Sequence, residues 1–156
     1  MSNRSVGFWG LQGSGWLLVA YLIYAQGIPA FDYDLGVKMG TQEAAEQITE
    51  VGVSFWYGFA FADAVIYIPL LVAGLVGLWR ANSWARVLTG AALGITVYWP
   101  VVVLAAAVKA RNAAGWYLDE SGYWVVLPLI SLWALWGLWW VARYRNRLPQ
   151  RAPTSQ

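Results

Sequence analysis

Long apolar stretches separated by short polar segments dominate the pattern along this chain. They cover residues 8–30, 51–79, 87–108 and 121–142, and they contain one charged residue, Asp63. A helix needs about 20 apolar residues to cross a hydrocarbon core about 30 Å thick, and each stretch reaches that length. The pattern therefore predicts an all-α, polytopic integral membrane protein that folds as a bundle of four transmembrane helices.

The stretches and their connections form one predicted membrane domain, residues 1–142, followed by a basic tail, residues 143–156. The tail combines arginines with Pro, Gln, Ser and Thr, which is typical of a disordered cytoplasmic segment beside anionic lipids. The first stretch follows Arg4 as the core of a signal peptide would, but it exceeds the core length of about 7–15 residues. We therefore expect residues 8–30 to be retained as the first span.

The polar segments differ in charge. Seven arginines and no acidic residue lie in the N-terminal segment, in residues 80–86 and in the tail. Residues 31–50 and 109–120 hold three basic residues and every acidic residue except Asp63. Because basic residues concentrate in the cytoplasmic loops of membrane proteins, we expect both termini to be cytoplasmic (N-in/C-in), in a bacterial plasma (inner) membrane.

Residues 41–50 carry the signals of a short helix that precedes the second span. Thr41 can act as its N-cap, and we expect the helix to bend at Gly52. Helical spacing would place three glutamates on one side of it, at Glu43, Glu46 and Glu50. This face is either an acidic rim that attracts cations or an ordinary solvated surface, and the segment can also cap the bundle or dock another protein.

Composition excludes several kinds of chemistry. The chain has no Cys, so it can form neither disulfides nor thiolate or iron–sulfur sites. It has no His, which removes the usual haem ligand and the commonest zinc ligand and general base. A single intramembrane carboxylate provides too few ligands for a metal ion. We therefore expect no cofactor, no metal site and no nucleic-acid partner.

Asp63 is the most informative residue. It lies 12 residues after Val51, or about 18 Å along the second span, close to the middle of the membrane. A charged residue there costs about 2.5–3.5 kcal/mol on insertion scales and usually faces a bundle interior or a watery cavity. No Lys or Arg lies at a similar depth. Asp63 is thus either protonated and hydrogen-bonded, or ionised beside a cation, a water cluster or a partner subunit's base.

Polar and aromatic residues at middle to outer depth in the four spans predict a pocket around Asp63. Tyr67 follows Asp63 by four residues, so the two share a helix face and Tyr67 can donate a hydrogen bond to it. Trp is abundant, at 12 residues, and buried indoles can form a wall for a flat or cationic ligand. The alternative is an aspartic acid that only orients the helices. The predicted pocket residues are Asp63, Tyr67, Tyr24, Gln26, Thr96, Tyr98, Trp99 and Ser131.

Prolines and glycines mark further features of the spans. Prolines recur within the last three spans, and each one frees the carbonyl four residues earlier, either to coordinate a cation or merely to kink the helix. Glycine pairs in the second and third spans predict close helix contacts, within the bundle or at a homodimer seam. These residues are Pro69, Pro100, Pro128, Gly74, Gly77, Gly90 and Gly94.

Three functions remain open at this stage. The first is a non-enzymatic membrane protein that binds an apolar or cationic small molecule or lipid around Asp63, or that serves as an accessory subunit of a membrane complex. The second is a small proton- or cation-coupled transporter that uses Asp63, as a homodimer. The third is a membrane-embedded enzyme acting on a lipid or isoprenoid, which would need a base that the spans do not provide. The expected partners are membrane lipids, a small ligand and a second copy or larger complex.

Overall fold

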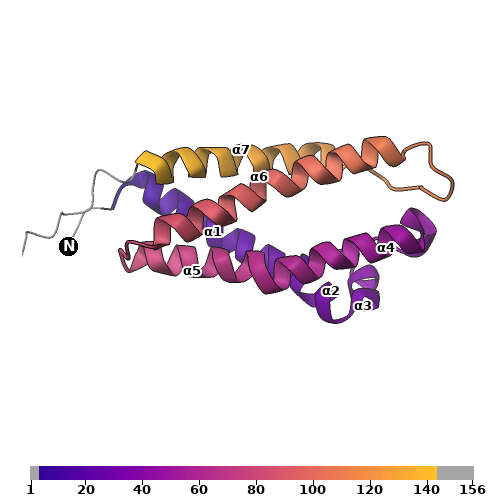
Figure 1. Cartoon of the computed structure of the whole chain (residues 1–156), viewed down its shortest axis with the longest axis horizontal. Helices are drawn as coiled ribbons and strands as arrows, with labels where there is room; N and C mark the ends of the chain where they lie inside the picture. Colours follow the sequence, from indigo (N-terminus) through magenta and orange to yellow (C-terminus); the bar gives the residue numbers. More distant parts are fainter. Residues whose placement is uncertain (1–3, 144–156) are drawn as a thin grey trace, which may run out of the picture.

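The computed structural model describes residues 4–143. Of the tail predicted at residues 143–156, Arg143 ends the last helix and residues 144–156 lie outside the described residues. The described part is helical and contains no strand (Figure 1). Two five-residue π-helical turns, η1 and η2, interrupt the first and second long helices. In chain order the elements are α1 (Val6–Leu22), η1 (Ile23–Gly27), α2 (Ile28–Phe31), α3 (Tyr33–Lys38), α4 (Ala45–Ala62), η2 (Asp63–Tyr67), α5 (Ile68–Trp79), α6 (Ala85–Ala110) and α7 (Tyr123–Arg143).

Four continuous helical stretches are long and apolar enough to cross a membrane. They are Val6–Phe31, Ala45–Trp79, Ala85–Ala110 and Tyr123–Arg143. In the most apolar 18-residue segment of each stretch, at most a third of the residues are buried inside the bundle. Large apolar side chains cover much of the outer surface. The expected all-α architecture of four apolar helices is confirmed, and it suggests an integral membrane protein.

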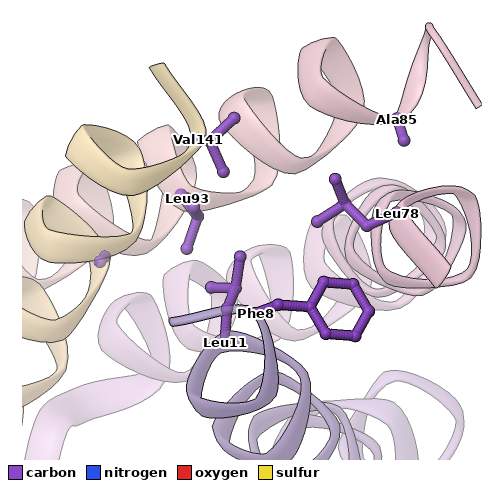
Figure 2. Close-up of a cluster of buried hydrophobic side chains, with 7 residues drawn as sticks. Phe8, Leu11, Leu78, Ala85, Leu93 and Val141 are labelled. Carbon is purple, nitrogen blue, oxygen red and sulfur yellow. The ribbon is translucent and has the colours of Figure 1, made fainter. Parts of the chain in front are cut away.

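All four spans meet near one end of the bundle. We call it the terminal end, because Arg4 and Arg143 lie there beside the connection from α5 to α6 (Figure 1). The opposite end, which carries residues 32–44 and 111–122, is the capped end. Figure 2 shows the side chains that converge in the core of the terminal half. The buried members of this cluster are Phe8, Leu11, Leu78, Ala85, Leu93, Ala134 and Val141.

Glycines allow α5 and α6 to pack closely. A Cβ atom on Gly74 would lie 2.8 Å from the amide nitrogen of Thr89 and 2.9 Å from its Cα, so a larger residue would push the helices apart. The prediction of a close helix contact at Gly74 is therefore confirmed. At Gly90 and Gly94 an added Cβ would meet nothing within 4 Å. These two glycines lie away from the helix contacts of the chain, and the predicted homodimer seam stays a prediction.

The two π-helical turns occur at equivalent places in two spans. The amide of Ile28 donates to the carbonyl of Ile23, and the amide of Ile68 donates to the carbonyl of Asp63. Each turn is followed at once by Ile-Pro, and the two turns pack against each other. Wide turns of this kind are frequent at functional sites. The sequence pattern pointed to Pro69, which follows η2, but Pro29, which follows η1, was not among the predicted features.

The helix expected at residues 41–50 starts and bends elsewhere. It begins at Ala45, and Thr41 caps no helix, because its hydroxyl donates to the carbonyl of Gly36 at 3.2 Å. The bend falls at Thr49, whose φ of 66° and ψ of 164° lie outside the helical region, and not at Gly52. The prediction that Glu43 shares a helix face with two later glutamates is therefore wrong, since Glu43 precedes the helix.

Candidate functional site

A cavity of about 390 Å³ lies between the spans in the half of the bundle nearer the capped end. Its walls come from α1 with η1, from α4 with η2, and from α6 and α7, while the segment 39–43 contributes a further wall. Most of the lining side chains are aromatic or polar. They are Tyr21, Tyr24, Ala25, Gln26, Met39, Gly40, Thr41, Gln42, Glu43, Trp56, Phe59, Asp63, Trp99, Val103, Gly122, Tyr123, Val126 and Leu127.

The cavity forms because α6 and α7 diverge from α4 toward the capped end (Figure 1). Contacts near that end bridge the divergence. The amide of Tyr117 donates to the carbonyl of Gln47 at 2.7 Å, and the rings of Trp56 and Trp116 meet edge to face with centroids 6.1 Å apart. The kink at Thr49 ends regular helix geometry beside Gln47, which leaves the Gln47 carbonyl available to this partner.

Asp63 lies at the start of η2 and faces the cavity. Its residue surface is 9% exposed. No hydrogen bond to its carboxylate is found within residues 4–143, and no Lys or Arg lines the cavity. A buried carboxylate without a partner is costly when it is ionised, so Asp63 is either protonated or stabilised by what the cavity contains.

Tyr67 lies one turn from Asp63 but does not donate to it. Its hydroxyl lies 2.5 Å from Oγ1 of Thr96, and that oxygen donates its own proton to the carbonyl of Ala92 at 2.9 Å. Tyr67 is therefore the donor in the Tyr67–Thr96 bond. Both side chains are fully buried and neither lines the cavity. The pair ties η2 to α6 beside the site, and the expected bond from Tyr67 to Asp63 is absent.

The remaining predicted pocket residues divide into two groups. Tyr24, Gln26 and Trp99 line the cavity together with Asp63. Tyr98 is 65% exposed and points away from the bundle, and Ser131 does not line the cavity either. The structure thus brings together four of the eight predicted residues.

Glu43 is the second acidic residue of the cavity. Its carboxylate accepts a hydrogen bond from the hydroxyl of Tyr123, and its backbone carbonyl accepts one from Tyr33 at 3.0 Å. Burial, with a smaller contribution from the Glu43 carboxylate, raises the pKa of Tyr33 above its ordinary value. The sequence predicts Glu43 on a helix face that is either a cation-attracting acidic rim or an ordinary solvated surface. Its cavity position arises because the segment before α4 folds back along α2.

Pro29 explains how that segment is held. Proline has no amide hydrogen, so the carbonyl of Ala25 lacks its helical partner. The side-chain amide of Gln42 donates to this carbonyl at 2.7 Å, and Gln42 is 7% exposed. Gly36 lets the chain approach, because a Cβ there would lie 2.7 Å from the Pro29 ring and 2.9 Å from Gln42. The Gln42–Ala25 bond therefore fixes one wall of the cavity.

The loop from α6 to α7 is held by charged groups outside the spans. Two nitrogens of the Arg111 guanidinium donate three hydrogen bonds to Glu120, and the indole of Trp124 donates a fourth at 3.0 Å. The bonds from Arg111 lower the pKa of Glu120 below its usual range. This loop carries Trp116 and Tyr117, so the ion pair supports the contacts that bridge the capped end.

Six aromatic side chains and two carboxylates give the cavity its chemical character. The aromatic faces carry negative electrostatic potential and attract cations. No group of three or more potential metal-ligating side chains occurs in residues 4–143. The aromatic lining residues are Tyr21, Tyr24, Trp56, Phe59, Trp99 and Tyr123.

Comparisons with protein-family models, with curated proteins and with solved structures found no match for this chain. Its class therefore rests on the structure. It is a helical bundle with four helices able to span a membrane, which suggests an integral membrane protein, and it encloses an aromatic cavity that contains Asp63.

Proposed function

We propose that this chain is an integral protein of a bacterial plasma membrane, with both termini in the cytoplasm, that binds a small organic cation in the cavity around Asp63. The charge distribution supports the orientation. Within residues 4–143, the terminal end carries four arginines and no acid, whereas the capped end and the adjoining ends of α4 and α6 carry seven acids and three basic residues. The cavity then opens near the outer surface of the membrane.

The observation that carries the proposal is the environment of Asp63. Asp63 is 9% exposed and faces a cavity, its carboxylate accepts no hydrogen bond within the described residues, and no Lys or Arg lines the cavity. A cation in the cavity would supply the missing counter-charge. In a medium of low dielectric constant this attraction is much stronger than in water.

The lining favours an organic cation over a metal ion. Metal ions such as Ca²⁺ take about six to eight oxygen ligands, whereas the cavity offers two carboxylates amid aromatic rings. An ammonium or phosphonium group gains from the aromatic faces about 0.5–2 kcal/mol per favourable contact. The carboxylate of Glu43 adds a second negative charge, although its bond to Tyr123 already engages it.

Binding can be tested with tetraphenylphosphonium and tetramethylammonium on the full chain in lipid nanodiscs, using tryptophan fluorescence and calorimetry. Asp63→Asn should weaken binding at least about tenfold, or about 1.4 kcal/mol, because it removes the charge at nearly constant volume. Glu46→Gln is the matched control, since this acid is exposed and does not line the cavity. Equal affinity of wild type and Asp63→Asn would overturn the proposal, and recovery in Asp63→Glu would exclude a folding defect.

A second candidate is a cation transporter that uses the same site, acting as a dimer. The paired π-helical turns favour it, because they interrupt two spans next to Asp63, and interrupted helices surround the sites of many transporters. Purified protein in liposomes should then show cation flux that depends on a proton gradient and is lost in Asp63→Asn. Binding without flux would leave the binding protein as the function.

A further inference from the structure

Side chains of the antiparallel helices α1 and α7 meet over the terminal half of the bundle. A Cβ on Gly10 would lie 3.3 Å from the ring of Trp136. One turn further along, the indole of Trp133 donates to the hydroxyl of Ser14 at 2.8 Å. These contacts define the register of the two antiparallel helices: residue numbers rise along α1 as they fall along the facing side of α7.

The same register places Tyr21 opposite Val126, and Tyr24 opposite Tyr123. All four residues line the cavity, which therefore lies between the two helices at this level. Tyr21, Tyr24 and Val126 are 49%, 45% and 44% exposed. Residues that line a cavity and are also this exposed mark an opening. We call this gap, bounded by Tyr21, Tyr24 and Val126, the lateral opening.

Contacts bridge the other sides of the cavity between spans. On the side of α4, the Trp56–Trp116 ring pair and the bond from Tyr123 to Glu43 join α4 and its preceding segment to α7 and the loop before it. The packing of η1 against η2 joins the first span to the second, and α6 packs along both α5 and α7. Gly40 and Gly122 also line the cavity and are exposed, so it has a second opening at the capped end. The lateral opening is the one that lies between two spans.

The surface around the lateral opening is apolar. Leu17 on α1 and Leu129 on α7 lie one turn from Tyr21 and Val126, and they are 73% and 61% exposed. These residues lie within two stretches able to span a membrane. In the bilayer this surface contacts acyl chains, so the opening connects the Asp63 cavity with the hydrocarbon region.

We propose that the ligand enters through the lateral opening from the bilayer and is therefore a cationic amphiphile, an ammonium-type headgroup carrying an apolar chain. The headgroup lies against Asp63 and the aromatic rings, while the chain passes between Tyr21 and Val126 into the lipid. This inference rests on the proposed cation binding and adds the substrate class and the route. A purely water-soluble cation would gain nothing from such an opening.

The test compares tetramethylammonium with hexyl-, octyl- and decyl-trimethylammonium on the full chain in nanodiscs. Affinities are corrected for the partitioning of each probe into protein-free nanodiscs. The corrected affinity should rise at least about tenfold from the first probe to the last. Val126→Trp should narrow the opening and abolish most of this gain, measured within the variant as the ratio of decyl-trimethylammonium to tetramethylammonium affinity. Val125→Trp is the matched control, because Val125 is exposed but does not line the cavity.

The outcomes separate the route from the function. Corrected affinities that do not change with chain length, with binding still lost in Asp63→Asn, would overturn the lateral route and leave the cation site intact. Equal weakening of all four probes by Val126→Trp would also overturn it, since the substitution would then act on the cavity itself. Failure of every probe to bind the wild-type protein would overturn the proposed function, and the lateral route with it.

Discussion

Asp63 and Tyr67 show how two neighbouring polar side chains take different roles in one apolar bundle. Tyr67 is satisfied by Thr96 and closed off from the cavity, so it stabilises the contact between η2 and α6. Asp63 faces open space and has no donor within the described residues. A group satisfied by the protein contributes to stability, whereas a group left without a partner is available to a ligand.

Tyr67→Phe should separate these roles. The change removes one hydrogen bond between buried groups and little volume, so the free energy of unfolding should fall by about 1 kcal/mol. Cation affinity should stay within about twofold of wild type, since the Tyr67 hydroxyl does not line the cavity. Chemical unfolding in detergent and the binding measurement report the two effects. Tyr98→Phe, at an exposed position, is the control, and a large loss of affinity in Tyr67→Phe would show that its hydroxyl reaches the ligand.

At the residue scale the sequence predicts the depth of a side chain in its span but not its direction. Asp63, Tyr24, Gln26 and Trp99 were grouped by depth, and they line one cavity. Tyr98 lies at the same depth as Trp99 but points in the opposite direction. Because α6 is apolar on all sides, no periodicity in the sequence marks the side of α6 that faces lipid. The roles of Gln42 and Glu43 depend on how a polar segment folds back over η1, which no local pattern in the sequence indicates.

At the scale of elements, the bond between Gln42 and Ala25 couples a loop to a helix interruption. Gln42→Leu should leave the Ala25 carbonyl buried without a donor and lower the free energy of unfolding by about 1–3 kcal/mol. Pro29→Ala restores an amide hydrogen four residues after Ala25. The double variant should therefore recover part of the loss. A double-mutant cycle measured by chemical unfolding gives the coupling, and strictly additive effects would contradict this explanation.

Thr49 carries the clearest backbone strain in the described residues. Its positive φ with ψ of 164° belongs to a region that side chains rarely adopt, and such conformations cost about 1–3 kcal/mol. Gly115, whose φ is +77°, packs against the Thr49 methyl group from the α6–α7 loop, where a Cβ would lie 3.0 Å away. The strained backbone at Thr49 of α4 therefore contacts the turn at Gly115, in the loop whose contacts with α4 span the cavity.

Thr49→Gly should relieve the strain and raise the thermal midpoint by about 2–4 °C for each kcal/mol gained. We expect a net gain of about 1 kcal/mol, because glycine accepts this φ freely. Val53→Gly is the control, since glycine in regular helix costs about 1 kcal/mol. Differential scanning fluorimetry and chemical unfolding of the purified chain compare the two variants. A fall in stability for Thr49→Gly similar to that for Val53→Gly would show that residue 49 is helical in the protein.

At the scale of the whole molecule, charge is distributed along the bundle axis. Arginines at the terminal end and acids at the capped end create a field that draws cations toward the end where the cavity lies. Arg4 is fixed there, because its guanidinium donates to the carbonyl of Trp79 at 2.7 Å and stacks on two aromatic rings. The sequence already indicates this asymmetry, whereas the cavity requires the divergence of the helices.

The proposed orientation can be tested with two matched serines, because the chain has no cysteine. Ser83 lies in the connection from α5 to α6 and Ser121 in the loop before α7, and both are exposed. In intact cells a membrane-impermeant maleimide should label Ser121→Cys and should reach Ser83→Cys only after permeabilisation. The reversed pattern would place the termini outside and make the acidic end cytoplasmic. The cavity would then collect cations from the cytoplasm, and the positive-inside distribution of arginines would be violated.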